Sequence, residues 1–267
     1  MTSPIQLPPR FEIRKLEPKH LPWVLAVINH SNMFNSPVWP VTYPEDRTKR
    51  TYQLCEGAKH LMGRSVDSGL SYGIFDKEYV FKRPESAVTG GELYWDATNT
   101  EATEQELLEQ MDFPLVAIAL SYDGLNEPKP EELKDFVGCL PLIATLFTQL
   151  SARDQRDPAT WKAKAAGEVL MRSGTATRAD YEGRGLTKTL AHWLMHEAAG
   201  MGYRGIQVEC AHPAVHKTWI NPPAPFKAQL ISELDSNTYE AEVDGKMARV
   251  FAPADVVFSK IYVTLKE

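Results

Sequence analysis

Apolar and polar positions along the first quarter of the chain predict one strand followed by two helices. The residue types alternate over Phe11–Leu16, as they do in a half-buried strand. After Pro18, apolar residues recur at three- and four-residue spacing over Leu21–Ile28, which predicts an amphipathic helix. The proline-rich stretch Ser36–Pro44 ends this helix, and a second helix is expected over Glu45–Met62.

Apolar segments in the remaining chain predict a central sheet. The expected strands are Phe113–Tyr122, Phe136–Leu146, Glu168–Thr177, Ile206–Cys210, Ala228–Leu234 and Val256–Leu265. Leu186–Met201 has the strongest helical periodicity, and Pro213–Ile220 predicts a short helix with proline in its first turn. Together these elements indicate an α/β (α+β) fold built on one sheet.

The aromatic-rich segment 70–112 departs from this regular pattern and is expected to be an insertion on the core. Short strands are predicted at Tyr72–Phe75, Glu78–Phe81 and Glu92–Trp95, and a short acidic helix at Glu101–Gln110. The aromatic side chains of this segment either line an acceptor pocket or belong to the core. We interpret the whole chain, 1–267, as one domain with a core motif region at 113–220 and closing strands within 226–267.

The composition is that of a globular protein, with 43% apolar and 24% charged residues in a chain of 267. The formal net charge of −6 argues against nucleic acid or an anionic membrane as a partner. No apolar stretch approaches the roughly 20 residues that span a bilayer, so we expect a cytoplasmic protein. Cys55, Cys139 and Cys210 are widely spaced and are expected to be free thiols.

The clearest candidate for chemistry is the passage in which a predicted strand leads through Gly183 and Gly185 into the strong helix. Glycines let a backbone approach a phosphate closely, and the N–H groups and dipole at a helix N-terminus attract the anion. Arg184 and Lys188 add positive charge. The pattern lacks the third glycine of a dinucleotide-binding fingerprint and the Gly-Lys-Ser/Thr of a Walker loop. A tight turn with solvated basic side chains is the alternative interpretation.

The segment Tyr181-Glu-Gly-Arg-Gly-Leu-Thr187 resembles the acetyl-CoA-binding motif of the GCN5-related N-acetyltransferase (GNAT) superfamily, Gln/Arg-x-x-Gly-x-Gly/Ala. Gly185 matches the defining glycine of that motif, Gly183 a common additional glycine, and Tyr181 an aromatic residue that often precedes it. Glu182 stands where Gln or Arg is usual, and Thr187 stands where Gly or Ala is usual.

This resemblance implies a mixed, mostly antiparallel sheet that is splayed between its fourth and fifth strands. Phe136–Leu142 is similar to the third strand of the family, Glu168–Thr177 to the fourth and Ile206–Cys210 to the fifth, and Asn221–Phe226 resembles a tail of fungal members. The pantetheine arm of acetyl-CoA, the implied cosubstrate, would lie in the gap. The implied CoA-binding residues are Gly174, Thr175, Ala176, Thr177, Glu182, Gly183, Arg184, Gly185, Leu186, Thr187 and Lys188.

For catalysis the resemblance implies direct attack of an amine on the thioester, with a carboxylate or an ordered water taking the proton. The candidate bases are Glu168, Glu209 and His212; a structural ion pair is the alternative for each, such as one between Arg172 and Glu209. Trp219 takes the position of the tyrosine that usually acts as the acid. Its indole N–H either supports the leaving sulfur or the ring simply packs.

The sequence therefore predicts an acetyl-CoA-dependent N-acetyltransferase that acts on the amine of a small molecule. No metal is expected, because His212 and His216 lie four residues apart without an evident third ligand. One alternative is a catalytically degenerate protein that binds acyl-CoA, which the departures at Glu182, Thr187 and Trp219 favour. Another is an N-acetyltransferase whose acceptor is a peptide or a protein.

Overall fold

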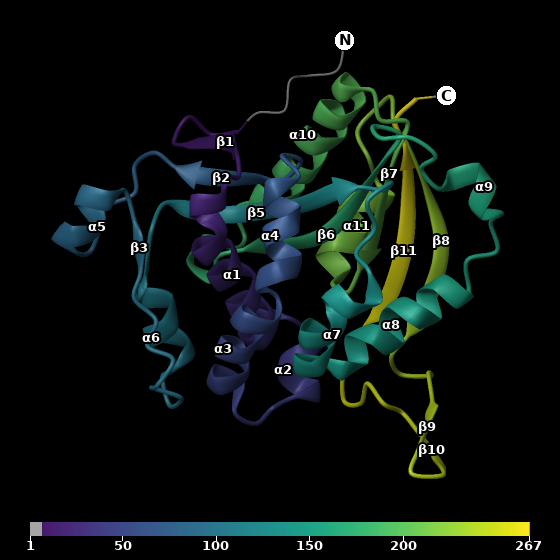
Figure 1. The fold of residues 1–267 in the computed structure, drawn as a ribbon, viewed down its shortest axis with the longest axis horizontal. Helices are drawn as coiled ribbons and strands as arrows, with labels where there is room; N and C mark the ends of the chain where they lie inside the picture. The colour runs from purple at the N-terminus through teal and green to yellow at the C-terminus, as the bar shows by residue number, and fades with distance from the viewer. Residues whose placement is uncertain (1–6, 267) are drawn as a thin grey trace.

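The computed structural model describes residues 7–266 and shows a seven-stranded sheet with helices on both faces (Figure 1). The strand order is β1-β2-β5-β6-β7-β11-β8, and every neighbouring pair is antiparallel except β6 and β7. The predicted mixed, mostly antiparallel sheet is confirmed. Its strands are β1 (Phe11–Lys15), β2 (Tyr72–Asp76), β5 (Leu115–Asp123), β6 (Val169–Thr177), β7 (Gly205–Cys210), β8 (Lys227–Asp235) and β11 (Val257–Thr264).

Strands β6 and β7 separate soon after they pair. They form a parallel pair over Val169–Met171 and Gly205–Gln207. Beyond this point β6 stays with β5 and β7 stays with β11, so a gap opens between Arg172–Thr177 and Val208–Cys210. Ser173 has no register partner in β5 and forms a bulge where the gap begins. The predicted splay is confirmed; below, "the splay" is this gap and "the vertex" is its closed end, just past Met171 and Gln207.

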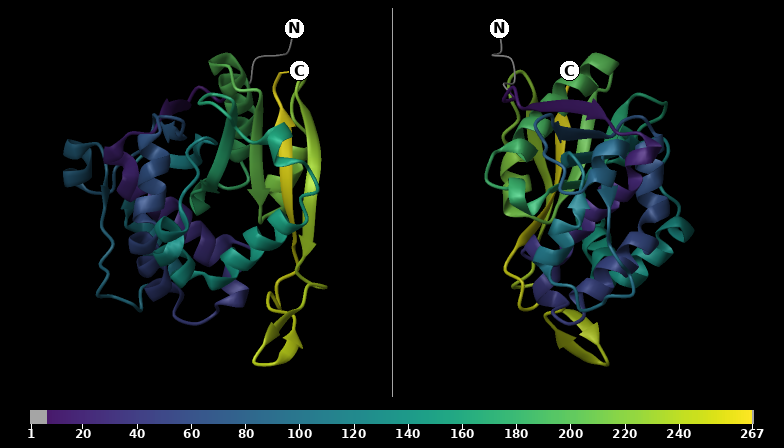
Figure 2. Two further views of the ribbon diagram at one scale, coloured as in Figure 1. Left: turned by 45° about the vertical axis from the view of Figure 1, so that its right-hand side comes forward. Right: turned by 90° about the vertical axis from the view of Figure 1, so that its left-hand side faces the viewer.

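Two helical layers enclose the sheet (Figure 2). Helices α10 (Leu186–Met201) and α11 (Pro213–Ile220) cover one face and have the predicted bounds. Within residues 7–266 no helix combines the length and the apolar character needed to cross a membrane. The opposite face carries α1 (Leu21–His30), α3 (Arg47–Gly57), α4 (Lys59–Asp67), α7 (Pro130–Cys139) and α8 (Pro141–Ala152).

Short elements complete the chain. The hairpin of β9 and β10 extends away from the body of the molecule and turns at Asp244 and Gly245 (Figure 1). These elements are η1 (Pro18–His20), the π-helical η2 (Ser31–Asn35), α2 (Trp39–Thr42), α5 (Pro84–Thr89), β3 (Glu92–Leu93), α6 (Glu104–Glu109), β4 (Met111–Asp112), α9 (Pro158–Trp161), η3 (Ala179–Tyr181), β9 (Ala241–Val243) and β10 (Lys246–Ala248).

The predicted helix over Glu45–Met62 is two helices, α3 and α4, which meet at Ala58. The chain changes direction next to Gly57, where the backbone of α7 approaches closely. A Cβ atom at Gly57 would lie 2.9 Å from the carbonyl oxygen of Asp135. The break therefore follows from a tertiary contact that the helical periodicity does not contain.

Phe136–Leu146 is helical, so the strand predicted there is wrong. Pro130 and Pro141 occupy the first positions of α7 and α8, where the missing N–H costs no helical hydrogen bond. Phe136 and Leu140 are buried four residues apart, as on the inner face of a helix. The third strand of the sheet is therefore β5.

Tyr72–Asp76 is a central strand, β2, so the added segment does not begin at residue 70. All five of its residues are buried, and β2 pairs with β1 on one side and with β5 on the other. A strand buried on both faces shows no apolar alternation, which is the signal that identifies a half-buried one. The added segment lies between Asp76 and Leu115; it contains β3 and the predicted acidic helix, α6, but no strand at Glu78–Phe81.

The core consists of two apolar clusters, one on each face of the sheet. On the α10 face, Leu190 and Leu194 of the helix pack with Leu170 of β6 and Val208 of β7. Both strands are thus fixed by the same cluster, although they do not pair with each other along the splay. Packing, rather than pairing, holds the gap open.

Candidate functional site

The loop between β6 and α10 has the conformation that its glycines predict. Gly183 and Gly185 have φ angles of +74° and +72°, in the left-handed region that favours glycine. Gly185 is the N-cap of α10, and open space surrounds the Cβ position of both glycines. The first N–H groups of a helix lack intrahelical partners, and its dipole is positive at that end. Residues Gly183–Lys188, "the cradle" below, therefore form a set of backbone donors suited to an anion.

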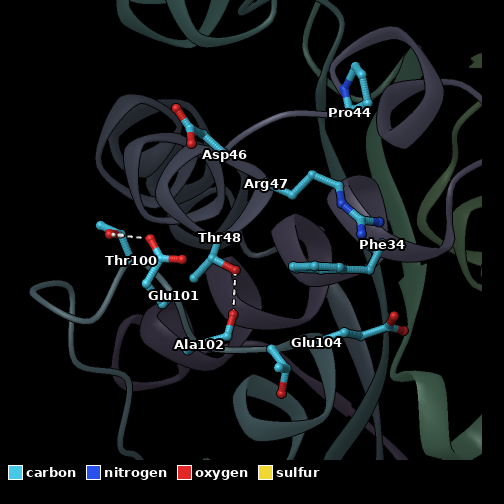
Figure 3. A pocket seen from close by; sticks show the side chains of 10 residues that line it. Phe34, Pro44, Asp46, Arg47, Thr48, Thr100, Glu101, Ala102 and Glu104 are labelled. Atoms are coloured by element: carbon cyan, nitrogen blue, oxygen red, sulfur yellow. Dashed lines mark hydrogen bonds between the residues drawn. The ribbon is translucent and has the colours of Figure 1, made fainter.

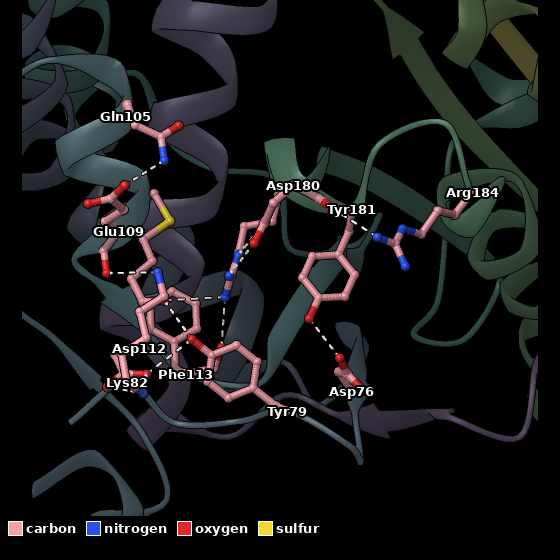
Figure 4. Close-up of polar contacts among 12 residues, drawn as sticks. Asp76, Tyr79, Lys82, Gln105, Glu109, Asp112, Phe113, Asp180, Tyr181 and Arg184 are labelled. Atoms are coloured by element: carbon pink, nitrogen blue, oxygen red, sulfur yellow. Dashed lines mark hydrogen bonds and ion pairs between the residues drawn. The ribbon is translucent and has the colours of Figure 1, made fainter. Parts of the chain in front are cut away.

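Buried ionic contacts fix the segment that leads into the cradle (Figure 4). Tyr181 donates its hydroxyl to Oδ2 of Asp76 at 2.6 Å, and Nε of Arg10 donates to Oδ1 of the same carboxylate at 2.8 Å. Burial raises the pKa of Asp76, but the hydrogen bonds from Arg10 and Tyr181 outweigh it and lower that pKa overall. Arg178 is buried and pairs with Asp180 at 2.6 Å. The cradle is thus joined to the rest of the sheet at its start.

Two charged side chains of this loop leave its backbone accessible. Arg184 folds back, donates to the carbonyl oxygen of Asp180 at 3.3 Å and lies 4.9 Å from the ring centroid of Tyr181 (Figure 4). Glu182 is exposed at the surface. Desolvation by the surrounding chain and the charge of Glu104 raise the pKa of Glu182.

Two of the residues predicted to bind CoA also make contacts that hold the cradle in place. Leu186 is buried in the core of the α10 face. Oγ1 of Thr187 lies 2.5 Å from Oγ1 of Thr177, which joins the first turn of α10 to the end of β6. Lys188 is exposed on the same turn. The departure from the family motif at Thr187 therefore has a structural explanation.

Residues Gly174–Thr177 of β6 form one wall of the splay. One edge of this segment pairs with β5, and the other edge has no partner strand beyond Met171. A Cβ atom at Gly174 would lie 2.7 Å from Cδ1 of Ile28, so α1 packs too closely for any larger residue. The free edge offers backbone N–H and C=O groups to an extended ligand.

Arg172 lies at the vertex, on the face that α10 and α11 cover, and is only 7% exposed. Its Nη1 donates to the carbonyl oxygen of Leu120 and to Oγ of Ser121, and its Nη2 donates to the carbonyl oxygen of Gly174 and to Oγ1 of Thr175. Nε has no hydrogen-bond partner among residues 7–266. Burial lowers the pKa of Arg172 to about 9.

Trp219 of α11 is fully buried beside Arg172. The guanidinium carbon lies 5.6 Å from the centroid of the indole ring, and the indole N–H has no partner in the described part of the chain. Cys210 of β7 is buried nearby, and burial raises the pKa of its thiol to about 12. Trp219 packs against the vertex, and Cys210 is held as a neutral thiol.

Glu209 lies just past the vertex, on the opposite face of the sheet. Its Oε1 is 3.9 Å from Nζ of Lys260 and 3.4 Å from Nε2 of Gln207. Burial raises the pKa of Glu209, although the charge of Lys260 acts in the other direction. The salt bridge considered between Arg172 and Glu209 is absent, because side-chain alternation places the two residues on opposite faces and Lys260 pairs with Glu209 instead.

The other two candidate bases make structural contacts. Glu168 lies before the paired end of β6, accepts the backbone N–H of Lys164 at 2.9 Å and lies 3.7 Å from Arg204. His212 is the N-cap of α11, and its Nδ1 accepts the backbone N–H of Ala214 at 3.0 Å. Burial lowers the pKa of His212, which keeps the ring neutral. The structure thus brings Glu209 and Trp219 to the vertex, but not Glu168.

The sequence analysis did not identify Lys260 as the partner of Glu209, and it did not predict that Arg172 is buried without an anionic partner in the described part of the chain. Each is the sole charged residue of its strand, Lys260 in β11 and Arg172 in β6. A single charge in an otherwise apolar strand indicates a buried charge, and that signal was available. Nδ1 of His216 lies 2.7 Å from Oγ of Ser259, and within residues 7–266 no three His, Cys, Asp or Glu side chains gather as metal ligands do.

A cavity of about 340 Å³ lies on the α1 side of the molecule, next to η2 and α3 (Figure 3). Arg47 extends over the ring of Phe34 at 5.2 Å, and Oγ1 of Thr48 donates to the carbonyl oxygen of Ala102 at 2.6 Å. Glu104, whose charge raises the pKa of Glu182, also lines the cavity. The lining residues are Phe34, Pro44, Asp46, Arg47, Thr48, Thr100, Glu101, Ala102, Thr103 and Glu104.

The arrangement of the sheet is shared with solved structures of N-acetyltransferases. Arylalkylamine N-acetyltransferase 2 from Aedes aegypti is 9% identical, with a TM-score of 0.59, and the match covers 96% of this chain and 99% of that one. Polyamine N-acetyltransferase from Drosophila melanogaster is 13% identical, with a TM-score of 0.57 and coverage of 95% and 99%. The chain has the GNAT fold.

The C-terminal condensation domain of Ebony, solved in complex with β-alanyl-dopamine, shares this GNAT fold. It is 17% identical, with a TM-score of 0.59, and the match covers 95% of this chain and 98% of that one. No protein-family model and no curated protein sequence matches the chain. The resemblance to fungal members stays a prediction.

Proposed function

We propose that the protein is an acetyl-CoA-dependent N-acetyltransferase that acetylates the amine of a small molecule. The observation that carries this proposal is the splay, in which β6 and β7 separate beside a glycine cradle at the N-terminus of α10. A free strand edge next to exposed N–H donors fits a ligand with an amide-containing arm and a diphosphate. CoA has both parts.

The cradle and the wall of the splay would hold the two parts of CoA. The diphosphate would bind the backbone N–H groups of Gly183–Lys188, where the positive φ angles of the glycines expose them. The pantetheine amides would pair with the free edge of Gly174–Thr177. Both contacts use backbone atoms, so the unusual side chains Glu182 and Thr187 do not prevent them.

Acetyl-CoA would supply the thioester, and Glu209 would take the proton of the attacking amine, directly or through one water. Because burial raises the pKa of Glu209, its carboxylate is a stronger base than that of an exposed glutamate. As the C–N bond forms and the C–S bond breaks, the electron pair passes to sulfur and the proton to Glu209. The proton then returns to the thiolate or to solvent.

A small amine as acceptor is supported by the names of the similar structures, which include an arylalkylamine and a polyamine N-acetyltransferase. The cavity next to η2 and α3 is a further feature that would attract such an amine to the protein. Asp46, Glu101 and Glu104 line this cavity against one cation, Arg47. A net negative lining favours an approaching ammonium ion over an anion.

Release of free thiol from acetyl-CoA, measured over a panel of arylalkylamines and polyamines, tests the proposal. We expect thiol release that requires both the protein and an amine, with a matching mass increase of one acetyl group in the amine. Binding of CoA without release for any amine would instead favour a degenerate acyl-CoA-binding protein. Release with peptide amines alone would favour a peptide or protein acceptor.

A further inference from the structure

Two neighbouring N–H donors at the vertex are buried and have no hydrogen-bond partner in the part of the chain that the structure describes. A guanidinium carries five N–H groups, and four of those of Arg172 are engaged by the carbonyl and hydroxyl oxygens of β5 and β6. The fifth, on Nε, has no partner within residues 7–266, and neither has the indole N–H of Trp219. The four engaged contacts fix the guanidinium plane, so the remaining donor has a defined direction.

The charge of Arg172 is also uncompensated. All four of its acceptors are neutral, and none of the ion pairs in the described part of the chain includes it. Arg178 provides the contrast, because it is equally buried but pairs with Asp180 at 2.6 Å. A buried cation without an anion is costly unless a ligand supplies the counter-charge.

No neighbouring titratable group supplies that counter-charge. Cys210 on β7 is held as a neutral thiol by burial, which raises its pKa to about 12. His216 on α11 is engaged with Ser259, and Glu209 lies on the opposite face with Lys260. On the face that α1 and α4 cover, Ile28 lies next to Gly174 and Oγ of Ser65 lies 2.8 Å from Oγ of Ser173, and neither side chain carries a charge. Within residues 7–266, therefore, no side chain provides Arg172 with an anion.

We infer that Arg172 and Trp219 form a thiolate-binding site, which receives the sulfur of CoA when the thioester breaks. The inference rests on the proposed function, because the splay directs the end of the pantetheine arm to the vertex. Arg172 would supply the charge and Trp219 a second N–H donor. Charge developing on sulfur is then met by donors that are already oriented.

Proton removal from the amine and formation of the thiolate would take place on opposite faces of the sheet at the vertex. The amine lone pair forms the C–N bond from the side of Glu209, which takes the amine proton. The electron pair of the breaking C–S bond passes to sulfur on the side of Arg172. Because base and thiolate site lie on opposite faces, Glu209 and Arg172 cannot neutralise each other, which explains why their salt bridge is absent.

The test is the pKa of the CoA thiol when CoA is bound, measured by the ultraviolet absorbance of the thiolate across pH. We expect a value at least about one unit below that of free CoA, as an adjacent buried cation requires. Arg172→Met should abolish the shift, Arg172→Lys should keep part of it, and Trp219→Phe should reduce it. Arg249→Gln, which removes an equal charge from the exposed segment after β10, should leave it unchanged.

A second measurement stays decisive if the Arg172 variants do not fold. CoA and desulfo-CoA are titrated into the unaltered protein at about pH 6 and about pH 8, where Arg172 is charged, and the ratio of their affinities should rise about threefold in favour of CoA. A constant ratio, or an unshifted thiol in bound CoA, would overturn the inference while leaving the proposed function intact. Failure of both compounds to bind at either pH would overturn the proposed function itself.

Discussion

The cradle and the vertex lie at opposite ends of the splay and differ in which part of the chain they present: backbone N–H groups in the cradle, charged and aromatic side chains at the vertex. The cradle is exposed, local in sequence and made of backbone donors, with two glycines at positive φ. The vertex is buried and made of side chains from four strands and a helix, with Arg172, Trp219, Glu209 and Lys260 at its centre. Under the proposed function, CoA binding and chemistry would thus take place at separate ends of the splay.

This difference predicts which measurable property a substitution at each end should alter. Under the proposed function, changes at the exposed glycines of the cradle should affect CoA affinity, because the backbone there would bind the diphosphate. Changes at the vertex should affect turnover, because its charges would act on the bonds that form and break. A variant at one end that altered the property assigned to the other would break the comparison.

The largest effect should come from Glu209→Gln. Removing the general base should lower kcat by about 10²- to 10⁴-fold while CoA affinity stays unchanged. Steady-state kinetics with the best amine, together with calorimetry of CoA binding, separate the two quantities. Glu168→Gln is the matched control and should retain most activity, because Glu168 makes only structural contacts. Full activity of the Glu209 variant would remove Glu209 from the mechanism.

The next effect is in the pH profile of kcat, which should be bell-shaped. Burial raises the pKa of Glu209, so its carboxylate form appears only above the usual glutamate range and the rate rises there. Burial lowers the pKa of Arg172 to about 9, so its charge is present below that value and lost above it. The rate should therefore fall about tenfold per pH unit above about 9. A plateau that continues past about pH 11 contradicts this role of Arg172.

A smaller effect is expected at the attachment of the cradle. Tyr181→Phe removes the hydroxyl that donates to Asp76, which Arg10 still contacts. The free energy of unfolding should fall by about 1 kcal/mol, and the CoA affinity should change little. Urea unfolding and CoA calorimetry on the same preparation measure both. A large loss of kcat with unchanged stability would assign Tyr181 to the chemistry.

The smallest effect should come from Cys210→Ser. Burial raises the pKa of this thiol to about 12, so no nucleophilic thiolate is available and no acetyl-cysteine should form. Turnover should remain near that of the unaltered protein, and intact-mass measurement after incubation with acetyl-CoA should show no adduct at this residue. Normal CoA binding with no turnover would reveal a covalent role for Cys210.

The same contrast explains how much the sequence could predict. The cradle was predictable because its signal is local: Gly183, Gly185 and the periodic helix that follows occupy one continuous segment. The splay and the fold class followed from the resemblance that this segment carries. The strand predicted at Phe136–Leu146 was wrong because a short apolar run fits a strand or a buried helix equally well. Pro130 and Pro141, the first residues of α7 and α8, were the better indicators of helix.

The vertex could be predicted only in part. Glu209 was a candidate because it lies on the predicted fifth strand, and Trp219 because the resemblance aligns it with the tyrosine of the following helix; the structure places both at the vertex. The alternative in which Glu209 pairs with Arg172 was wrong. Side-chain alternation and strand order decide which residue faces Glu209, and that residue, Lys260, lies far away in the chain. The lack of an anionic partner for Arg172 is likewise a tertiary property. It depends on which side chains of the described residues surround the guanidinium in the fold, and no local sequence pattern contains that information.

The central claim is that CoA lies in the splay with its diphosphate on the cradle, and calorimetric titration of CoA into two glycine variants tests it most directly. Gly185→Val and Gly202→Val replace glycines of positive φ at the two ends of α10, with open space around both. We predict a loss of about 2 kcal/mol of binding, roughly 30-fold, for Gly185→Val and none beyond any shared loss of stability for Gly202→Val. Equal CoA affinity in the two folded variants would contradict the account.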